Sequence, residues 1–533
     1  MFNTPRSRRG MVTSPHHLAS EAGLRVLRDG GNAIEATIAM ASMLAVVYPH
    51  MTAIGGDGFW LVSAPGQDPV ALDACGGAAM AATPALYARH GHDTIPWRGP
   101  LAANTVAGTV SGWGEAMALS SEMGGTLPLS RLLEDAVWSA ENGFPVTRSQ
   151  QELTTEKQPE LQDQPNFAKT FLADNQPPRE GTWMKLPALG QTLRRIGRDG
   201  PEDFYRGALA RDIAADLAAC GSPVALADLN AHHAQRRKAL SVNVSGARVF
   251  NFPPPTQGLS SLMILALFDR LKVRDAEGFA HIHGMVEATK QAFIVRDRII
   301  GDPASMVEDP QTYLHDDMLD RLAARIDTQK ALPWPHVAQK GDTVWLGAID
   351  AQGVAVSFIQ SIYFEFGSGC VLPQTGFVWQ NRGASFALSG TGPRVIGAGR
   401  KPFHTLNPAV ALFGDGRRMV YGTMGGEGQP QTQAALFSRY AMFGQGLQEA
   451  ITAPRWLLGK TWGDQSITLK LENRFDPALV AALQVVGHDI EILPAFTSTM
   501  GHAGAVVQHT SGPQSGLFEG ATDPRSDGAA IGF

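Results

Sequence analysis

Residues 341–381 read GDTVWLGAIDAQGVAVSFIQSIYFEFGSGCVLPQTGFVWQN. Residues 344–349 and 354–361 are rich in β-branched and aromatic residues, and the residues 350–353 between them are typical of a turn. The pattern therefore predicts a strand hairpin that places Thr343 at the head of an inner strand. Residues 331–340 contain two prolines and no apolar period, which indicates an exposed connection upstream of that strand.

An exposed connection that runs into Asp342 and Thr343 at a strand start is what a self-cleaving precursor needs. A threonine hydroxyl is a weak nucleophile until a base removes its proton, and a free α-amine, with a pKa of about 7.7–8.0, suits that task. The other interpretation is that Thr343 is one more β-branched strand residue. An isolated Gly-Asp-Thr does not decide between the two.

The composition is that of a globular protein without a basic bias. The 533 residues are 44% hydrophobic and 18% charged, which suits one large α/β unit or several domains. A net charge of −6 argues against nucleic-acid binding. Three scattered cysteines predict no disulfide framework. No apolar run is placed as a secretory signal or is long enough to span a bilayer, so we expect a cytoplasmic protein that does not bind membranes.

Apolar residues at helical spacing predict several helices along the chain. They cover residues 19–28, 33–47, 128–142, 189–217 and 281–296, and Gly200-Pro201 punctuates the range 189–217. The glycine cluster at 55–58 lacks the lysine of a phosphate-binding loop, so we interpret it as a tight turn before a strand at 59–64. The polar segment 150–185 is interpreted as a surface excursion or a lid.

No metal or cofactor is expected from the spacing of the ligand-type residues. His281 and His283 stand two apart on a predicted helix and point to different faces, and His16 and His17 are adjacent and poor ligands. The run GTMGGEG at 422–428 does not have the GxGxxG spacing of a dinucleotide-binding loop.

The ordered motifs around Thr343 resemble those of the γ-glutamyltranspeptidase family. The resemblance is carried by Gly-Asp-Thr at 341–343, Asp350, Gly353, Phe-Gly-Ser-Gly at 366–369, Gly376 and Asn-Arg-Gly at 381–383. Further matches lie at 10–62, 200–207, 253–258, 422–428 and 522–528. The likeness is specific around Thr343 and the glycine pair 425–426, and diffuse between residues 85 and 250.

This resemblance implies an N-terminal nucleophile hydrolase with an α+β fold, an αββα sandwich. The precursor would cut itself before Thr343 into a large chain 1–342 and a small chain 343–533, which stay associated; further homo-oligomerisation is left open. Thr343 would be the nucleophile and its own α-amine the base, with the hydroxyl of Ser361 nearby. Gly425 and Gly426 would supply backbone N–H groups to an oxyanion hole, where a side chain would obstruct close approach.

The positions that hold a γ-glutamyl group in the family are altered in this sequence. Cys75 stands where transpeptidases carry an arginine that grips the α-carboxylate, and neither cysteine nor the following glycine replaces a bidentate anchor. Threonine, asparagine, glutamine, aspartate and a serine pair of the transpeptidases are replaced here by Ser361, Tyr363, Arg382, Ser385 and His404-Thr405.

Arg382 adds a cation that can pair with a carboxylate next to the scissile carbonyl; a structural ion pair is its other interpretation. A cytoplasmic branch of the family hydrolyses oxamate to oxalate and ammonia in purine-derived nitrogen salvage, and this chain resembles that branch. We therefore predict an amidohydrolase of small amide acids whose pocket includes Tyr363, Arg382, Ser385, His404 and Thr405. The alternatives are a γ-glutamyl hydrolase or transpeptidase acting on glutathione-like substrates, and a non-catalytic relative used for binding.

Overall fold

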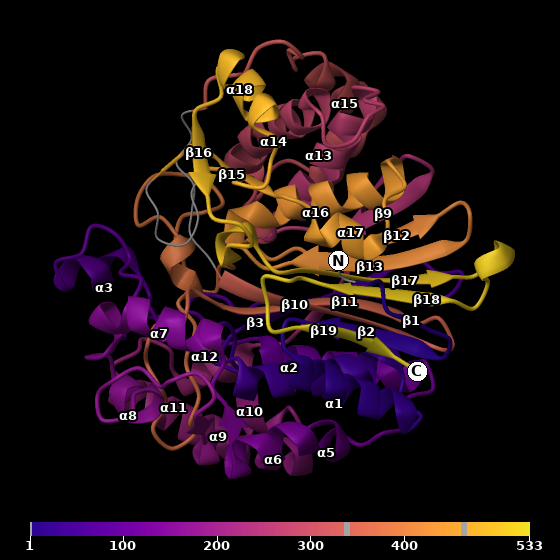
Figure 1. Ribbon diagram of the computed structural model, residues 1–533. Helices are drawn as coiled ribbons and strands as arrows, with labels where there is room; N and C mark the ends of the chain where they lie inside the picture. The colour runs from indigo at the N-terminus through magenta and orange to yellow at the C-terminus, as the bar shows by residue number, and fades with distance from the viewer. Residues whose placement is uncertain (1–2, 335–341, 460–465) are drawn as a thin grey trace.

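The computed structural model describes residues 3–334, 342–459 and 466–533. Two seven-stranded sheets lie face to face, and helices cover both outer faces, so the molecule has four layers in the order αββα (Figure 1). This arrangement confirms the predicted fold class. None of the described helices combines the length and the apolar character that crossing a membrane requires.

The sheet that contains the predicted hairpin has the strand order β19-β2-β10-β11-β3-β4-β7. Its strands, in that order, are Ala529–Gly532, Gly10–Ser14, Asp342–Asp350, Ala355–Tyr363, Asp57–Ser63, Val70–Ala74 and Gln235–Lys238. Strands β10 and β11 pair antiparallel through the turn at 350–353, with Gly347 opposite Ser357. The hairpin is confirmed, and Thr343 lies at the start of an inner strand.

The second sheet has the order β1-β18-β17-β13-β12-β9-β8. Its strands are Arg6–Ser7, Phe518–Thr522, Ala503–His509, Arg417–Thr423, Ala409–Phe413, Ala247–Asn251 and Leu240–Val244. Both sheets thus combine strands from before and after residue 342. In the first sheet β10 and β11 lie between β2 and β3, which come from the N-terminal part of the chain.

Helices from the N-terminal part cover the outer face of the first sheet (Figure 1). They include α1 His17–Arg28, α2 Ala33–Val47, α4 Thr109–Glu122, α5 Leu129–Leu132, α6 Glu134–Asn142, α9 Pro187–Asp199, α10 Asp203–Arg206 and α11 Ala208–Cys220. The other outer face is covered by α13 Gly258–Arg270, α14 Phe279–Ile299, α15 Asp316–Ala323, α16 Gln429–Phe437, α17 Leu447–Thr452 and α18 Pro477–Val485. The predicted helices are therefore present, with two of the predicted ranges divided into shorter helices.

Each interface between layers has its own apolar core. The core between the sheets includes Phe59, Trp345, Ile359, Val420 and Val506, all almost fully buried. Two larger cores join each sheet to its helices. Because both faces of the sheets are covered, all nine residues of β11 are buried, as the apolar character of residues 354–361 leads one to expect.

Helix α2 begins where the sequence provides its own cap. The Asn32 side chain accepts the N–H groups of Ile34 and Glu35, and the Glu35 carboxylate accepts the N–H of Asn32. The Asp350 carboxylate, from the hairpin turn, accepts the Ala33 N–H at 2.9 Å. A carboxylate at a helix N-terminus is favourable, so this contact joins the hairpin to the helix that covers it.

The segment 150–185 is more regular than the predicted surface excursion or lid. Most of α7 Arg148–Leu161 lies within it, followed by α8 Phe167–Phe171 and β6 Trp183–Met184. Strand β6 pairs antiparallel with the short strand β5 Phe144–Pro145. Leu161, Phe167 and Phe171 belong to the core beneath the first sheet. The polar composition of this segment reflects its exposed face, while a few apolar side chains hold it in place.

One sequence prediction concerns residues that the structure describes only in part. Residues 331–334 of the predicted exposed connection are described, and the remainder falls outside the described residues.

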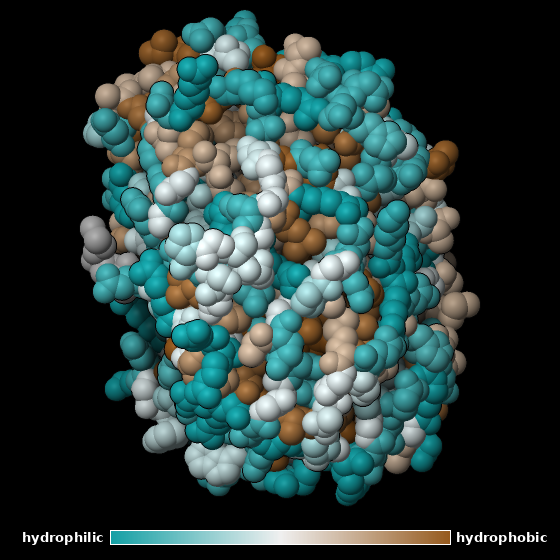
Figure 2. Space-filling view, turned by 90° about the vertical axis from the view of Figure 1, so that its right-hand side faces the viewer, coloured by the Kyte–Doolittle hydropathy of each residue, from teal (hydrophilic) through white to brown (hydrophobic). Residues whose placement is uncertain are grey.

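The face shown in Figure 2 is largely hydrophilic, with hydrophobic residues in small scattered groups. Such scattered exposure is ordinary for a globular protein.

Candidate active site

Four neighbouring strands of the first sheet place residues of interest side by side. Ser361 near the end of β11 is directly opposite Asp57 at the start of β3. Asp342 pairs with Tyr363 on the other side of β11, and Thr343 follows Asp342 at a bulge. Cys75 follows β4, which pairs with β3 through Gly58 and Ala74. These residues therefore lie along one end of the sheet, although they come from distant parts of the sequence.

The second sheet contributes loops at the same place. Gly425 and Gly426 follow β13, whereas His404 and Thr405 precede β12, which is antiparallel to β13. Gln257 joins the two loops, since its side-chain N–H group donates to the Thr405 carbonyl at 2.7 Å and to the Gly426 carbonyl at 2.9 Å. The antiparallel pairing therefore brings both loops to one end of the sheet.

Thr343 contacts the helix that follows the glycine turn. Its side chain is fully buried, and the Gln429 side chain donates to its Oγ1 at 3.3 Å. Gln429 is the first residue of α16, directly after the glycine turn. The proposed nucleophile is thus hydrogen-bonded to the helix that begins where the turn assigned to an oxyanion hole ends. The Ser361 hydroxyl, on the neighbouring strand, accepts the Tyr363 N–H at 2.8 Å.

The glycine turn has the backbone geometry that glycine permits. Gly425 has φ 118° and Gly426 has φ 53°, both in the region that other residues rarely adopt. Within the described residues, neither N–H has a hydrogen-bond acceptor. Two N–H groups that are free to meet a ligand oxygen are the requirement of an oxyanion hole.

A buried ion pair between Arg296 and Glu427 lies next to the glycine turn. Arg296 of α14 donates to Glu427 at 3.0 Å and to the Gln257 side-chain oxygen at 3.0 Å. Arg296 and Glu427 are almost fully buried. Because Gln257 also holds Thr405 and Gly426, one network fixes the positions of both loops.

Arg382 is the most unusual side chain of the site. It is fully buried, and none of its three guanidinium nitrogens has a hydrogen-bond partner within the described residues. Its guanidinium carbon lies 3.8 Å from the centre of the Tyr363 ring, a cation–π contact. Burial lowers the pKa of Arg382 to about 10, which leaves it charged at neutral pH. A buried cation with unused donors is suited to bind an anion.

The backbone of Tyr363 has an uncommon conformation. Its φ is 82°, and such a conformation costs a non-glycine residue roughly 1–3 kcal/mol. Burial raises the pKa of Tyr363 to about 12, so it remains neutral beneath the arginine. Arg382 itself begins a short 3-10 helix, Arg382–Ser385. Gly383 is required there, since a Cβ atom would come within 1.6 Å of the Asn104 side chain.

Asp57 and His404 form a buried pair beside Arg382. His404 Nε2 lies 2.9 Å from an Asp57 carboxylate oxygen, and both side chains are fully buried. Burial raises the pKa of Asp57 to about 7, against the opposing effects of the Gly76 N–H and Arg382. Burial, then the charges of Arg382 and Lys401, hold the pKa of His404 well below its usual range. His404 is therefore neutral.

The remaining predicted pocket residues lie in the same region. The Ser385 hydroxyl donates to the Phe403 carbonyl at 3.1 Å, next to His404. The Thr405 hydroxyl is buried and has no hydrogen-bond partner within the described residues. The structure thus brings Arg382, Ser385, His404 and Thr405 into neighbouring positions, while their contacts with a substrate stay predictions.

Two groups of described residues place three metal-ligand atoms within 4.8 Å of one another: Asp57 with Cys75 and His404, and His283 with Glu287 and His488. In the first group the carboxylate is already hydrogen-bonded to Gly76, Gly108 and His404. Nearby Arg382 and Lys401 oppose a further cation. In the second group the Glu287 carboxylate contacts the Lys290 ammonium at 2.6 Å. Neither group therefore fits a metal ion.

Sequence reasoning missed Asp57, Gln257 and Gln429. It assigned residues 55–58 to a turn, and the strand pairing that sets Asp57 beside Ser361 joins positions about 300 residues apart. Gln257 falls in the PPPTQG motif and Gln429 follows the GTMGGEG motif, so their places beside those motifs were the available signal. The buried group of His283, Glu287 and His488 could have been found in part from the sequence, because His283 and Glu287 stand four residues apart on a predicted helix.

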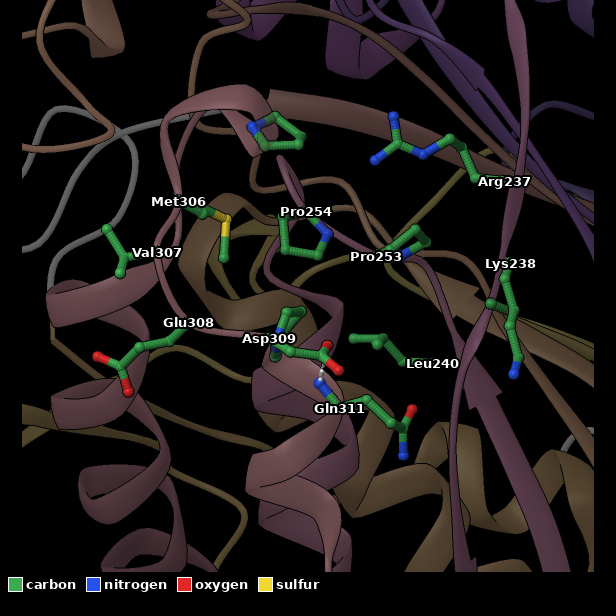
Figure 3. Close-up of a pocket in the computed structure, with 13 residues that line it drawn as sticks. Arg237, Lys238, Leu240, Pro253, Pro254, Met306, Val307, Glu308, Asp309 and Gln311 are labelled. Carbon is green, nitrogen blue, oxygen red and sulfur yellow. Dashed lines mark hydrogen bonds between the residues drawn. The ribbon is translucent and has the colours of Figure 1, made fainter.

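A separate pocket lies at the edges of both sheets (Figure 3). Its volume is about 520 Å³, and its lining includes Arg237, Lys238, Pro253, Met306 and Gln311. No serine, threonine, cysteine or histidine lines it, so these described residues offer no hydroxyl, thiol or imidazole group as the nucleophile of acyl transfer. The strand-end site, with Thr343, is the better candidate for chemistry.

Comparison with known proteins supports the family resemblance. The family model for gamma-glutamyltranspeptidase matches residues 19–533. The oxamate amidohydrolase proenzyme of Klebsiella pneumoniae subsp. pneumoniae is 53% identical over 534 residues, which cover 100% of both chains. The glutathione hydrolase-like YwrD proenzyme of Bacillus subtilis is 37% identical over 526 residues, 98% of each chain.

Solved structures show the same fold. The cephalosporin acylase from Bacillus halodurans superposes with a TM-score of 0.91 at 30% identity, covering 100% of this chain and 97% of that one. The match spans this whole chain and therefore the whole αββα arrangement. The chain belongs to the gamma-glutamyltranspeptidase family.

Proposed function

We propose that this protein hydrolyses a small amide that carries a carboxylate next to the scissile carbonyl, with oxamate, giving oxalate and ammonia, as the preferred substrate. The observation that carries the proposal is the fully buried guanidinium of Arg382, whose nitrogens have no hydrogen-bond partner within the described residues. Such a group is complementary to a carboxylate that lies close to the reacting carbonyl. The similarity to a relative named for oxamate hydrolysis supports the same substrate.

We propose that the nucleophile is made by self-cleavage between Asp342 and Thr343, which would leave chains 1–342 and 343–533. The α-amine of Thr343 then takes the proton of its own hydroxyl. The Oγ atom forms a bond to the amide carbon, and the N–H groups of Gly425 and Gly426 stabilise the oxyanion. The C–N bond breaks, and the proton leaves with ammonia. Water then cleaves the oxalyl ester, which releases oxalate and restores the hydroxyl.

The substrate is tested by ammonia release from a series of amide acids. We expect oxamate to react faster than malonamate and succinamate, in which the carboxylate is one and two carbons farther from the amide. A γ-glutamyl anilide should be poor, because Cys75 stands in place of the family's carboxylate anchor. A preference for the γ-glutamyl compound over every small amide acid would refute the proposal and favour a glutathione-type activity.

The nucleophile is tested with Thr343→Ala. We expect this variant to remain a single chain and to release no ammonia, whereas the parent protein should run as two chains with Thr343 at the start of the smaller one. Denaturing gels, intact mass and N-terminal sequencing provide the measurement. An uncut but fully active parent would contradict the mechanism.

The proposal also includes a cytoplasmic location and a role in releasing nitrogen from purine-derived oxamate. Fractionation of cells that express the tagged protein tests the location. Loss of growth on oxamate as nitrogen source, after deletion of the gene, tests the role.

A further inference from the structure

His404 has one ring nitrogen whose role is fixed and one that has no assigned role. Its Nε2 lies 2.9 Å from Asp57 Oδ2. The other Asp57 oxygen accepts the N–H groups of Gly76 at 3.0 Å and Gly108 at 3.1 Å. Above the Asp57 pKa of about 7 the carboxylate is ionised and only accepts hydrogen bonds, so Nε2 then carries the imidazole proton and Nδ1 keeps an unshared lone pair.

The ring is held firmly in this orientation. The His404 N–H donates to the Pro255 carbonyl at 2.9 Å, and the His404 carbonyl accepts the Gln257 N–H at 2.9 Å. Phe59 packs edge-on against the imidazole, with ring centres 4.8 Å apart. The ring therefore has little freedom to change which nitrogen contacts Asp57.

Nδ1 is a buried acceptor without a donor. His404 is fully buried, and Nδ1 has no hydrogen-bond partner within the described residues. A buried polar atom left in this state costs about 1–3 kcal/mol. The guanidinium nitrogens of Arg382 are likewise buried without a partner within the described residues, but they are donors. A single ligand that reaches both groups can satisfy both if it offers a carboxylate to the arginine and an N–H to the histidine.

We propose that His404 Nδ1 accepts an N–H of the substrate's primary amide while Arg382 holds the adjacent carboxylate. The inference rests on the proposed function and adds a reason why the substrate should be an amide. An ester with the same carboxylate has no N–H to donate, so Nδ1 would remain unpaired against the ester oxygen. Asp57 is then a positioning residue, since it acts by fixing the tautomer of His404.

The test compares oxamate with monomethyl oxalate, which keeps the carboxylate and the reacting carbonyl but has no N–H. His404→Gln can keep an N–H donor toward Asp57, but it has no acceptor at the place of Nδ1. We expect its ratio of kcat/KM, oxamate over monomethyl oxalate, to fall about tenfold or more below that of the parent. Spontaneous ester hydrolysis is subtracted with enzyme-free samples.

His404→Asn is the matched variant, because its side-chain oxygen can take the place of Nδ1. We expect it to recover part of the preference for the amide. The appearance of two chains and an unchanged melting temperature show that each variant is folded; a histidine variant that fails these checks is replaced by Asp57→Asn, which should also lower the ratio.

Equal losses on both substrates, or no loss on oxamate, would overturn the role of His404 and leave the proposed function standing. A parent protein that cleaves the ester but not oxamate would overturn both.

Discussion

Two sets of buried arginines in this protein differ in how their charges are satisfied. Arg455 and Arg525 are buried, and their guanidinium groups donate to the carboxylates of Asp523 and Glu472. Arg382 is just as buried but has no carboxylate partner within the described residues. Arg455 and Arg525 with their carboxylates form a closed network, in which each charge is paired within the protein. The donors of Arg382 remain available to a ligand. Burial alone therefore does not distinguish a structural cation from a binding one; the pairing does.

The closed network should respond most strongly to the loss of one partner. Asp523→Ala leaves Arg455 and Arg525 short of a buried counter-charge, so we expect the free energy of unfolding to fall by about 3–5 kcal/mol. Urea unfolding followed by circular dichroism measures the change.

Asp415→Ala is the matched control for that measurement. Asp415 pairs with Arg417 at the surface, with more than half of its side chain exposed, and the loss there should be below about 1 kcal/mol. Equal losses in the two variants would show that the buried network contributes no more to stability than a surface ion pair.

Arg382 should show the opposite balance of stability and activity. Arg382→Met removes an unpaired buried charge, so the free energy of unfolding should stay the same or rise. Arg382→Gln should lower kcat/KM for oxamate by about tenfold to a hundredfold, since a charged hydrogen bond contributes about 1.5–3 kcal/mol. Both variants should still cut themselves. If Arg382→Gln hydrolyses oxamate as well as the parent, the substrate assignment is wrong.

A smaller expected effect is a difference in how stability depends on pH between the Asp57 carboxylate, beside Arg382, and the Asp523 carboxylate of the closed network. Burial raises the pKa of Asp57 to about 7, above its unfolded value of about 3.9. The folded protein therefore binds the extra proton, and this contribution to stability is present below pH about 4 and lost as the pH rises to about 7. The slope should be at most about 1.4 kcal/mol per pH unit, and absent in Asp57→Asn.

Asp523 should respond to pH in the reverse direction. Burial alone would raise the pKa of Asp523, but Arg455 and Arg525 outweigh burial and lower it. Its contribution to stability is therefore present above the unfolded pKa of about 3.9 and lost as the pH falls below that value. Unfolding curves of the parent protein and both variants between pH 3 and 7 measure the two slopes. Parallel curves for the parent and Asp57→Asn would contradict the shift assigned to Asp57.

Local patterns in the sequence predicted the elements that local physics determines. The β-branched runs on both sides of residues 350–353 predicted the hairpin, and the apolar residues of 33–47 predicted a helix, which the structure buries. Resemblance, rather than pattern, singled out Gly425 and Gly426. Their positive φ angles supply the physical reason for glycine there.

Long-range pairing set the limit of prediction. Asp57 and His404 are 347 positions apart, and only the assembled sheets bring them within 2.9 Å. The unpaired state of Arg382 was equally hidden, because a sequence does not show which neighbours a side chain lacks. The helical content of 150–185 was missed since Pro159 and the polar composition masked its few core residues.

The mixing of strands in the first sheet has a consequence for refolding. Strands β10 and β11 lie between β2 and β3, so after the proposed cut neither piece can complete the sheet by itself. Unfolding would then release two separate molecules, and renaturation would become a second-order process that slows on dilution. The uncut Thr343→Ala chain would renature at a rate independent of its concentration. Self-cleavage would thus make the durability of the mature enzyme a matter of how slowly it unfolds.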